Sequence, residues 1–321
     1  MKKLIVHMGA HRCASSATQA FLRRNRADIE PHMCLMLRDD LAAGKHGIAM
    51  NRLYDYRAWH LARRAEVAAT RKAIAAVSQD SILVSEENLM GLMPGHLGAG
   101  FYPGFERFCA ALGRLAGVAE IHPRLIVRRQ DRLLESIYGF RVAFGLRDDM
   151  PAFLAPLVGE DLSWMRMIHA FERFGFGETA KIDVLEAWPR EGTTAHLMAF
   201  LGLPELPLSG GGLRMGNSRF SEAALELMLA MNRTGTGVDI SWRRQVLFPA
   251  LRQGAEPTVQ LIAELLELPE DRAAVLRAAL QVPARFSLTD EERAAILKSC
   301  GESNCVFLKH AMVGASGDIW A

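Results

Sequence analysis

The first residues that could do chemistry lie in the turn from Gly9 to Ser16. The turn follows a short apolar run, residues 4–8, and leads into a pattern that predicts a helix beginning at Ser15. The first N–H groups of a helix are unpaired and the helix dipole favours negative charge there, so such a turn is a natural anion site. Arg12 adds a positive charge, and Ser15 and Ser16 add hydroxyl donors. The sequence therefore predicts an anion-binding turn here.

The same turn differs from the Walker A loop of nucleotide-binding enzymes, G-x-x-x-x-G-K-[ST]. Gly9 and Ser16 match its first glycine and its final hydroxyl, but Ala14 replaces the second glycine and Ser15 replaces the lysine. Because that lysine contacts the β- and γ-phosphates, its absence argues against an ATPase or kinase. A P-loop kinase-like enzyme stays an alternative.

A second group of residues lies much further along the chain. Arg128 ends an apolar run, residues 124–128, that predicts a strand, and Ser136 follows eight residues later on a predicted helix. Ligands of α/β proteins bind at the carboxyl ends of the strands. An arginine and a hydroxyl suit a dianionic phosphate monoester through charge-assisted hydrogen bonds. We therefore expect a phosphate site at Arg128 and Ser136.

Together, the two groups resemble the donor-binding motifs of the sulfotransferase family, in the family's order. The family's 5′-phosphosulfate loop has the form G-x-x-K-[ST]-G-T-T between a strand and a helix. Arg12 stands at its lysine, Ala14 at its second glycine, and Ser15 and Ser16 at its two threonines. The family's 3′-phosphate motif is an arginine at a strand end and a serine eight residues later. Residues 82–89 and 214–221 also resemble stretches of bacterial members.

This resemblance implies a fold, a donor and a reaction. The expected reaction is in-line transfer of a sulfuryl group from 3′-phosphoadenosine 5′-phosphosulfate to a hydroxyl or amine of a small molecule, carbohydrate or glycolipid. The 5′ side of the donor is expected to contact Gly9, Arg12, Cys13, Ala14, Ser15 and Ser16. Arg128 and Ser136 are expected to hold the 3′-phosphate, which ATP lacks. The reaction needs no metal, and no metal-ligand spacing is present in the sequence.

The proton acceptor of the reaction is predicted from position. Members of the family use a histidine or a glutamate. Glu86 and Glu87 follow an apolar strand pattern, residues 81–85, and His46 lies where bacterial members often carry a histidine. We predict Arg12, His46 and Glu86 as the catalytic residues. Two histidines that flank the loop remain alternatives: His7 and His11.

Two departures from the family pattern support a different interpretation. Arg12 keeps a positive charge but cannot readily give up a proton, whereas a lysine can act as an acid. Ala14 lacks the conformational freedom of glycine. A catalytically impaired, sulfotransferase-like nucleotide-binding protein is therefore a second alternative.

The elements that must position these residues alternate between strands and helices. Strands are predicted over 4–8, 81–85, 124–128 and 182–185, and helices from 15 to about 28 and over 62–78, 105–115, 131–144 and 193–201. This alternation predicts an α/β core with a central parallel sheet flanked by helices, similar to P-loop nucleotide-binding folds. We expect the core to cover residues 1–210 and a mainly helical extension, 211–321, to pack on it. A Gly/Pro-rich segment, 91–104, is predicted to be a mobile loop whose Phe101 and Tyr102 could line the acceptor site.

Composition limits the other classes of function. The chain has 321 residues, of which 50% are hydrophobic and 23% are charged, with a net charge of +2. This is a globular composition without the basic excess of a general nucleic-acid binder. No apolar run approaches a membrane span and the N-terminus does not resemble a signal peptide, so we expect a cytoplasmic protein. The five cysteines contain no CxxC pair, which argues against a zinc ribbon or a disulfide framework. The helical C-terminal third could also supply a homodimer contact.

Overall fold

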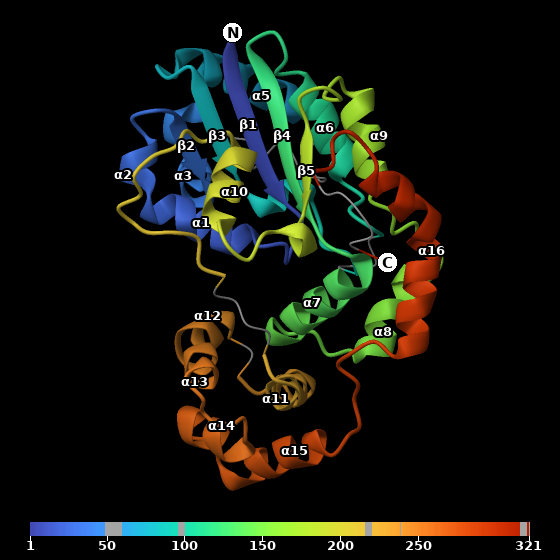
Figure 1. Ribbon diagram of the computed structural model, residues 1–321. Coiled ribbons are helices and arrows are strands. Elements are labelled where there is room, and N and C mark those ends of the chain that lie inside the picture. The colour runs from blue at the N-terminus through green and yellow to red at the C-terminus, as the bar shows by residue number, and fades with distance from the viewer. Residues whose placement is uncertain (49–59, 96–99, 216–219, 238, 315–319, 321) are drawn as a thin grey trace. The chain divides into compact units, whose positions relative to one another are not determined.

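The structure is a computed structural model that describes the chain except residues 49–59, 96–99, 216–219, 238, 315–319 and 321 (Figure 1). Internal contacts divide the chain into two compact units. The sheet unit contains Met1–Gln130, Asp161–Gly216 and Leu297–Ala321, and the helical unit contains Asp131–Glu160 and Asn217–Ile296. The chain thus crosses between the units four times. The single boundary predicted at residue 210 lies close to one of these crossings.

A parallel sheet of five strands in the order β2-β3-β1-β4-β5 forms the centre of the sheet unit. The strands are β1 (Lys2–Gly9), β2 (Cys34–Leu37), β3 (Ser81–Ser85), β4 (Ala119–Val127) and β5 (Lys181–Val184). Leu4, Ile5 and Val6 of the central strand β1 are fully buried, as expected when helices cover both faces of a parallel sheet. The predicted α/β class with a central parallel sheet is therefore confirmed.

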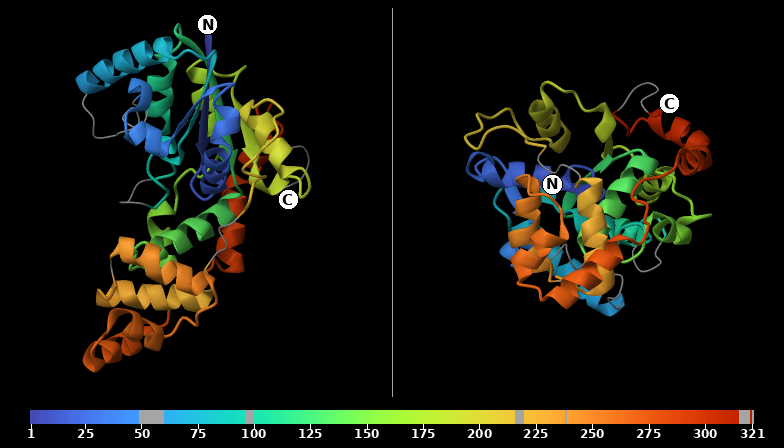
Figure 2. Two further views of the ribbon diagram at one scale, coloured as in Figure 1. Left: turned by 90° about the vertical axis from the view of Figure 1, so that its left-hand side faces the viewer. Right: turned by 90° about the horizontal axis from the view of Figure 1, so that it is seen from below.

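Helices lie on both faces of this sheet. Figures 1 and 2 show α1 and α10 on one face and α5 and α6 on the other. The α-helices that lie in the sheet unit are α1 (Ser15–Arg24), α2 (Arg26–Ile29), α3 (Arg38–Ala42), α5 (His60–Ala76), α6 (Phe105–Gly113), α9 (Met165–Arg173) and α10 (Thr193–Leu201). Three short 3-10 helices accompany them: η1 (Lys45–Gly47), η2 (Glu87–Met90) and η4 (Leu185–Ala187). The helices predicted over 62–78, 105–115 and 193–201 are confirmed to within two residues at each end.

Two elements near the N-terminus differ from the prediction. Helix α1 ends at Arg24 instead of continuing to residue 28, because the buried Asn25 interrupts it. The Asn25 side-chain amide donates to the Phe21 and Gly211 carbonyls, at 3.0 Å each. The prediction also missed β2, which has only four residues.

The mainly helical pattern expected over 211–321 is confirmed, and most of these helices lie in the helical unit. Its elements are α8 (Met150–Leu154), η3 (Ala155–Leu157), α11 (Glu222–Thr234), α12 (Ile240–Trp242), the π-helical turn η5 (Arg243–Leu247), α13 (Phe248–Arg252), α14 (Val259–Leu266) and α15 (Glu270–Leu280). Helices α7 (Gln130–Ala143) and α16 (Asp290–Leu308) each have residues in both units.

Two buried side chains of the helical unit hold the C-terminal end of α7. Asn232 donates to the Val142 carbonyl at 2.8 Å, and Arg243 donates to the Ala143 carbonyl at 3.0 Å. The last carbonyls of a helix have no partner within the helix, and the negative end of the helix dipole favours a cation there. Burial lowers the pKa of Arg243 to about 10, so the guanidinium remains charged at neutral pH.

Candidate functional site

The loop between β1 and α1 has a backbone shape that suits an anion. Arg12 and Ala14 both lie in the left-handed region, with φ values of 66° and 60°. The Cys13 N–H donates to the Ala10 carbonyl at 3.0 Å, so the chain turns back on itself before α1 begins. Left-handed residues within a turn direct successive N–H groups toward one point, and such arrangements bind anions. The sequence-based prediction of an anion loop thus has a matching backbone conformation.

The loop is held close to the end of β4 and to the start of α1. The Ala10 N–H donates to the Ile126 carbonyl of β4 at 3.1 Å. A Cβ atom on Gly9 would lie 2.9 Å from the Ser15 Cβ, so only glycine allows the turn to pack against the helix at this distance. Ser15 is 2% exposed, whereas Ser16 is exposed. The two predicted hydroxyl donors therefore have different surroundings.

Of the two adjacent glutamates after β3, Glu87 contacts the loop. The Ser15 hydroxyl donates to Glu87 Oε2 at 2.5 Å. Glu86 is 2% exposed and instead accepts from the N–H and side-chain amide of Asn88, at 2.9 and 2.6 Å. Burial raises the pKa of Glu86, and its hydrogen bonds with Asn88 and the charge of Arg38 oppose the rise. The sequence prediction favoured Glu86, but the structure brings Glu87 to the loop.

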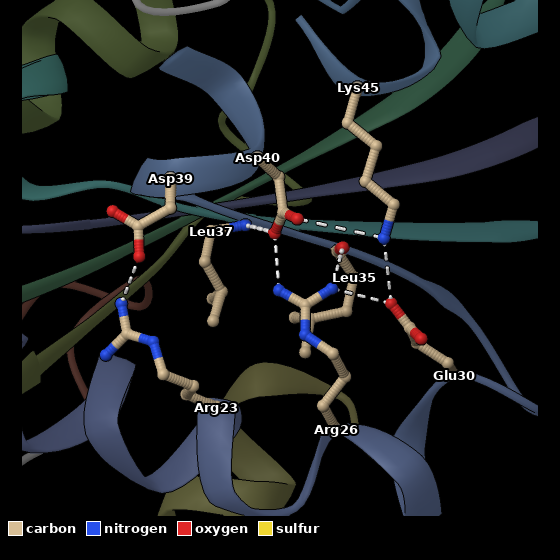
Figure 3. A network of polar contacts seen from close by, with 8 residues as sticks. All are labelled: Arg23, Arg26, Glu30, Leu35, Leu37, Asp39, Asp40 and Lys45. Atoms are coloured by element: carbon tan, nitrogen blue, oxygen red, sulfur yellow. Dashed lines mark hydrogen bonds and ion pairs between the residues drawn. The ribbon is translucent and has the colours of Figure 1, made fainter. Parts of the chain in front are cut away.

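His46, the second predicted proton acceptor, is an exposed residue of η1. An ion-pair network fixes the chain immediately before it (Figure 3). Lys45 Nζ lies 3.1 Å from Glu30 Oε1 and 3.7 Å from Asp40 Oδ1, and Arg26 pairs with both of these carboxylates. Among the described residues, no hydrogen bond or ion pair joins His46 to the β1–α1 loop.

The network in Figure 3 holds α2, β2 and α3 together. Burial by itself raises the pKa of Asp40, but hydrogen bonds from the Leu37 N–H and from Arg26, with the charges of Arg26 and Lys45, lower it below its usual value. The Leu37 N–H to Asp40 Oδ2 distance is 2.9 Å. Asp40 is therefore ionised at neutral pH, and its role here is structural.

Arg128 follows β4 and lies beside a carboxylate that the sequence analysis missed. Arg128 Nε is 3.4 Å from Glu186 Oε1, and the Arg129 N–H donates to Glu186 Oε2 at 3.3 Å. The Trp320 indole N–H donates to the same Oε2 at 3.3 Å. Glu186 comes two residues after β5, as Glu87 comes two residues after β3. Because carboxyl ends of parallel strands meet at one edge of a sheet, this shared position is the signal that could have identified Glu186.

The charges of both predicted motifs act on one buried thiol. Burial raises the pKa of Cys13, while the positive charges of Arg128 and Arg12 lower it and the negative charge of Glu186 raises it further. Arg12 lies in the loop after β1, Arg128 follows the neighbouring strand β4, and the Ala10 N–H to Ile126 carbonyl hydrogen bond joins the loop to that strand.

A buried aromatic cluster connects the two motifs. The His11 N–H donates to the Tyr102 hydroxyl oxygen at 3.2 Å, and the Trp164 indole N–H donates to the Arg128 carbonyl at 2.9 Å. The rings of Tyr102 and Trp164 are 5.9 Å apart, and Phe101 packs edge-on against both. Phe101 is 0% and Tyr102 1% exposed. These two aromatic residues thus support the loop from within the core, and the expectation that they line an acceptor site is wrong.

His7 and His11 are both buried beside the loop. His7 Nδ1 lies 2.8 Å from the Ser85 hydroxyl, and its Nε2 has no partner within the described part of the chain. Burial lowers the pKa of His7 to about 4, so His7 is neutral at physiological pH. The His11 ring stacks on Tyr102 at 5.9 Å. Neither histidine is exposed, at 1% for His7 and 5% for His11.

Ser136, the predicted partner of Arg128, lies in α7 within the helical unit. Arg128 belongs to the sheet unit, so their joint action on a phosphate stays a prediction. Over the described ranges, no group of three or more His, Cys, Asp or Glu side chains is arranged to hold a metal ion. Likewise, none of the described helices has the length and apolar character needed to span a membrane.

Comparison of the chain with protein-family models, with curated proteins and with solved structures gave no match.

Proposed function

We propose that the chain is a sulfotransferase that uses 3′-phosphoadenosine 5′-phosphosulfate as its donor. One observation carries the proposal: a loop with left-handed residues and the backbone of a strand-end arginine both hydrogen-bond to one buried aromatic cluster, through Tyr102 and Trp164. The loop and Arg128, which resemble parts of the family's donor site, thus belong to the same part of the sheet unit. A donor with phosphate groups at both its 5′ and 3′ ends requires two such sites.

The residues of the sheet unit suit the two ends of this donor. Arg12, the N–H groups of the β1–α1 loop and Ser16 would hold the 5′-phosphosulfate, and Arg128 would hold the 3′-phosphate. Arg128 has 28% of its side chain exposed, and Glu186 lies beside its Nε atom. The donor supplies the sulfuryl group, and Arg12 and the loop N–H groups stabilise negative charge on the phosphate side.

Glu87 is the residue we propose as the proton acceptor. It is half-buried, and its carboxylate touches the loop through Ser15. A carboxylate there can take the proton from an acceptor hydroxyl, provided that the acceptor lies within hydrogen-bond reach. Glu86 is less suited, because it is buried and already accepts two hydrogen bonds from Asn88.

One observation favours a second function, nucleotide binding without turnover. Arg12 in the loop keeps a positive charge that can hold a nucleotide phosphate, but it cannot readily supply a proton to a leaving group.

Calorimetric binding of adenosine 3′,5′-bisphosphate to the full chain tests the proposal, with adenosine 5′-monophosphate and ATP as comparison ligands. The proposal predicts selective binding of the bisphosphate and transfer of sulfate from the donor to a panel of phenols, alcohols and sugars. Binding without transfer would support the second function. A preference for ATP would contradict use of the bisphosphate-type donor in both functions and would favour a kinase-like enzyme. Absence of nucleotide binding would contradict both functions.

The variant Arg128→Ala tests the 3′-phosphate assignment, with Arg129→Ala as a matched control of equal charge. Loss of a charge-assisted contact of about 1.5–3 kcal/mol corresponds to about 10- to 100-fold weaker binding of the bisphosphate. The Arg128→Ala change should leave the affinity for the monophosphate unchanged. An equal loss for both nucleotides would show that Arg128 does not read the 3′-phosphate.

A further inference from the structure

A recess at the edge of the sheet contains a histidine–aspartate pair that the proposed sulfotransfer does not use. Residues of β5, α10 and the segment after α16 line the recess, which has a volume of about 310 Å³. This volume is at the lower end of the range for small-molecule sites. The recess shares no residue with the β1–α1 loop or with Arg128.

Backbone hydrogen bonds hold two walls of the recess together. The Ile182 N–H donates to the Met312 carbonyl at 2.7 Å, and the Gly314 N–H donates to the Ile182 carbonyl at 2.9 Å. Ile182 and Val313 also form an isolated parallel β-bridge. The segment after α16 therefore lies along β5, and the recess between them is preformed, as small-molecule sites usually are.

The pair consists of His196 on α10 and Asp183 on β5. His196 Nε2 lies 2.6 Å from Asp183 Oδ2, and Asp183 Oδ1 accepts from the Val184 N–H at 3.0 Å. Because an aspartate carboxylate only accepts hydrogen bonds, Nε2 of His196 carries its hydrogen toward Asp183. The Trp188 ring packs against the His196 ring, with the ring centres 5.9 Å apart. The histidine is thus held in one orientation and, when neutral, in one tautomer.

The other ring nitrogen of His196 offers a hydrogen-bond acceptor to a ligand. A neutral imidazole has one N–H group, so with its hydrogen on Nε2 the ring presents a lone pair at Nδ1. No group in the described part of the chain forms a hydrogen bond with Nδ1, and Nδ1 is not buried. The His196 side chain is 34% exposed and lines the recess. A ligand that reaches Nδ1 must therefore donate a hydrogen bond.

The second polar group that faces a ligand is a cation. Lys181 is exposed, lines the recess and forms no ion pair with any described residue. Its ammonium can donate to an oxygen of the ligand. A cationic ligand would be repelled by Lys181, and an anionic ligand would face the lone pair of His196 Nδ1. One neutral hydroxyl group suits both residues, because it can donate to Nδ1 and accept from Lys181.

The remaining walls are mainly apolar. Phe200 and Met312 line the recess and are 8% and 5% exposed. A phenyl ring and a thioether both make favourable contacts with an aromatic ring. Gly314 leaves space beside them: a Cβ atom on it would meet the Ile182 carbonyl oxygen at 3.7 Å, an ordinary contact distance. These walls suit a small apolar body, and an aromatic ring best of all.

We infer that this recess is a second ligand site, which binds a small neutral hydroxyl compound with an apolar body, such as a phenol. The hydroxyl group donates to His196 Nδ1 and accepts from Lys181, and the apolar body packs against Phe200 and Met312. Asp183 is a positioning residue, because it acts on the ligand only through His196.

Ligand-observed NMR with phenol and the full chain tests this inference at about pH 8.5, where histidine side chains are generally neutral and phenol keeps its proton. For a ligand of this size we expect saturable binding with a dissociation constant on the order of 1 mM. Anisole has the same ring with an oxygen that cannot donate, and benzoate carries an anion in place of the hydroxyl group. Each should bind at least about threefold more weakly than phenol. Absence of saturable phenol binding up to about 20 mM, or binding of either comparison ligand as tight as that of phenol, would overturn the inference.

The variant Asp183→Asn tests the positioning role through the choice of ligand. The Val184 N–H keeps the new amide oxygen on its own side, so the amide NH2 group faces His196 and donates to Nε2. The hydrogen of the neutral ring then moves to Nδ1, which becomes a donor beside Lys181. We expect the ratio of phenol affinity to benzoate affinity to fall at least about tenfold. An unchanged ratio, with both ligands weakened alike, would mean that Asp183 is only structural and would contradict the positioning role.

The variant Gly314→Leu locates the binding, because it fills the recess without changing a polar group. It should weaken phenol binding at least about tenfold. Ala195→Gln, at an exposed position of α10 that does not line the recess, is the control and should change nothing. Equal phenol affinity in the wild type and in Gly314→Leu would place the binding elsewhere and overturn the assignment of the recess.

These measurements are independent of the proposed sulfotransferase function. Binding of adenosine 3′,5′-bisphosphate should be the same in Gly314→Leu and in the wild type. Failure of the donor to bind therefore leaves the phenol result interpretable.

Discussion

Replacing Ala14 by glycine tests whether the β1–α1 loop has the backbone conformation described above. Ala14 has φ 60° and ψ 8°, in the left-handed region. A residue with a Cβ atom is destabilised there by about 1–2 kcal/mol, whereas glycine adopts this region readily. Glycine also gives the unfolded chain more freedom, which costs about 0.4–1 kcal/mol. We therefore expect Ala14→Gly to raise the free energy of unfolding of the sheet unit by about 0.5–1 kcal/mol.

Urea unfolding of the full chain measures this gain. Trp164 and Trp188 lie in the sheet unit and Trp242 lies in the helical unit, so tryptophan fluorescence follows the unfolding of both units. With a urea slope of about 3 kcal/mol/M, the expected gain moves the midpoint up by about 0.2–0.3 M. The slope itself should not change, because the substitution alters no buried apolar group.

The control for this experiment is Ala17→Gly, at a regular position inside α1. Glycine in a helix interior destabilises by about 0.5–1 kcal/mol relative to alanine. The same chemical change is therefore expected to have opposite signs at residues 14 and 17. A destabilisation by Ala14→Gly similar to that of Ala17→Gly would refute the left-handed conformation of the loop and the anion site built on it.

Three further predictions follow from the surroundings of the loop. Tyr102→Phe removes the acceptor of the buried His11 N–H. It should lower the free energy of unfolding, measured by urea titration, by about 1–3 kcal/mol. An unchanged free energy of unfolding would contradict this hydrogen bond. Burial depresses the pKa of His7 to about 4 in the folded protein, against 6.5 for a free histidine. Because the unfolded chain takes up a proton first, the free energy of unfolding should fall by up to about 3 kcal/mol as the pH decreases from 6.5 toward 4. The variant His7→Gln should show a smaller decline between pH 7 and 4.5 than the wild type, and equal declines would show that His7 is not the titrating group. Arg12→Lys should retain or raise the rate of sulfate transfer from the labelled donor, because lysine can both neutralise and protonate a leaving group. Complete loss of transfer would mean that the planar guanidinium of Arg12 is required.

The sheet was predictable where apolar residues form a continuous run. The segments around Leu4, Leu83 and Val127 were predicted as buried strands from their apolar runs. These runs are continuous because helices cover both faces of the sheet. Strand β2 was not predictable in this way, since its four apolar residues run directly into the helix-forming residues of α3. The polar residues Glu120 and His122 likewise concealed the first half of β4.

The candidate site was predictable in its motifs but not in its side-chain partners. Spacing along the chain identified Arg12 and Arg128, because each follows a buried strand of the same sheet. Spacing could not decide between Glu86 and Glu87, since the choice depends on which carboxyl group the turn after β3 directs toward Ser15. The aromatic support was also hidden, because a Gly/Pro-rich segment gives no pattern that distinguishes buried rings from exposed ones.

The placement of charged residues at the strand ends has a consequence for how the protein could change over evolution or in the laboratory. Glu87, Arg128 and Glu186 each lie within two residues of the end of a different strand, after the last buried apolar residue. A substitution at any one of them changes the charge at the sheet edge while leaving the apolar layers intact. For the proposed anion site, this arrangement would let ligand preference be altered one strand end at a time, and a small library at these three positions would test different anions on one unchanged scaffold.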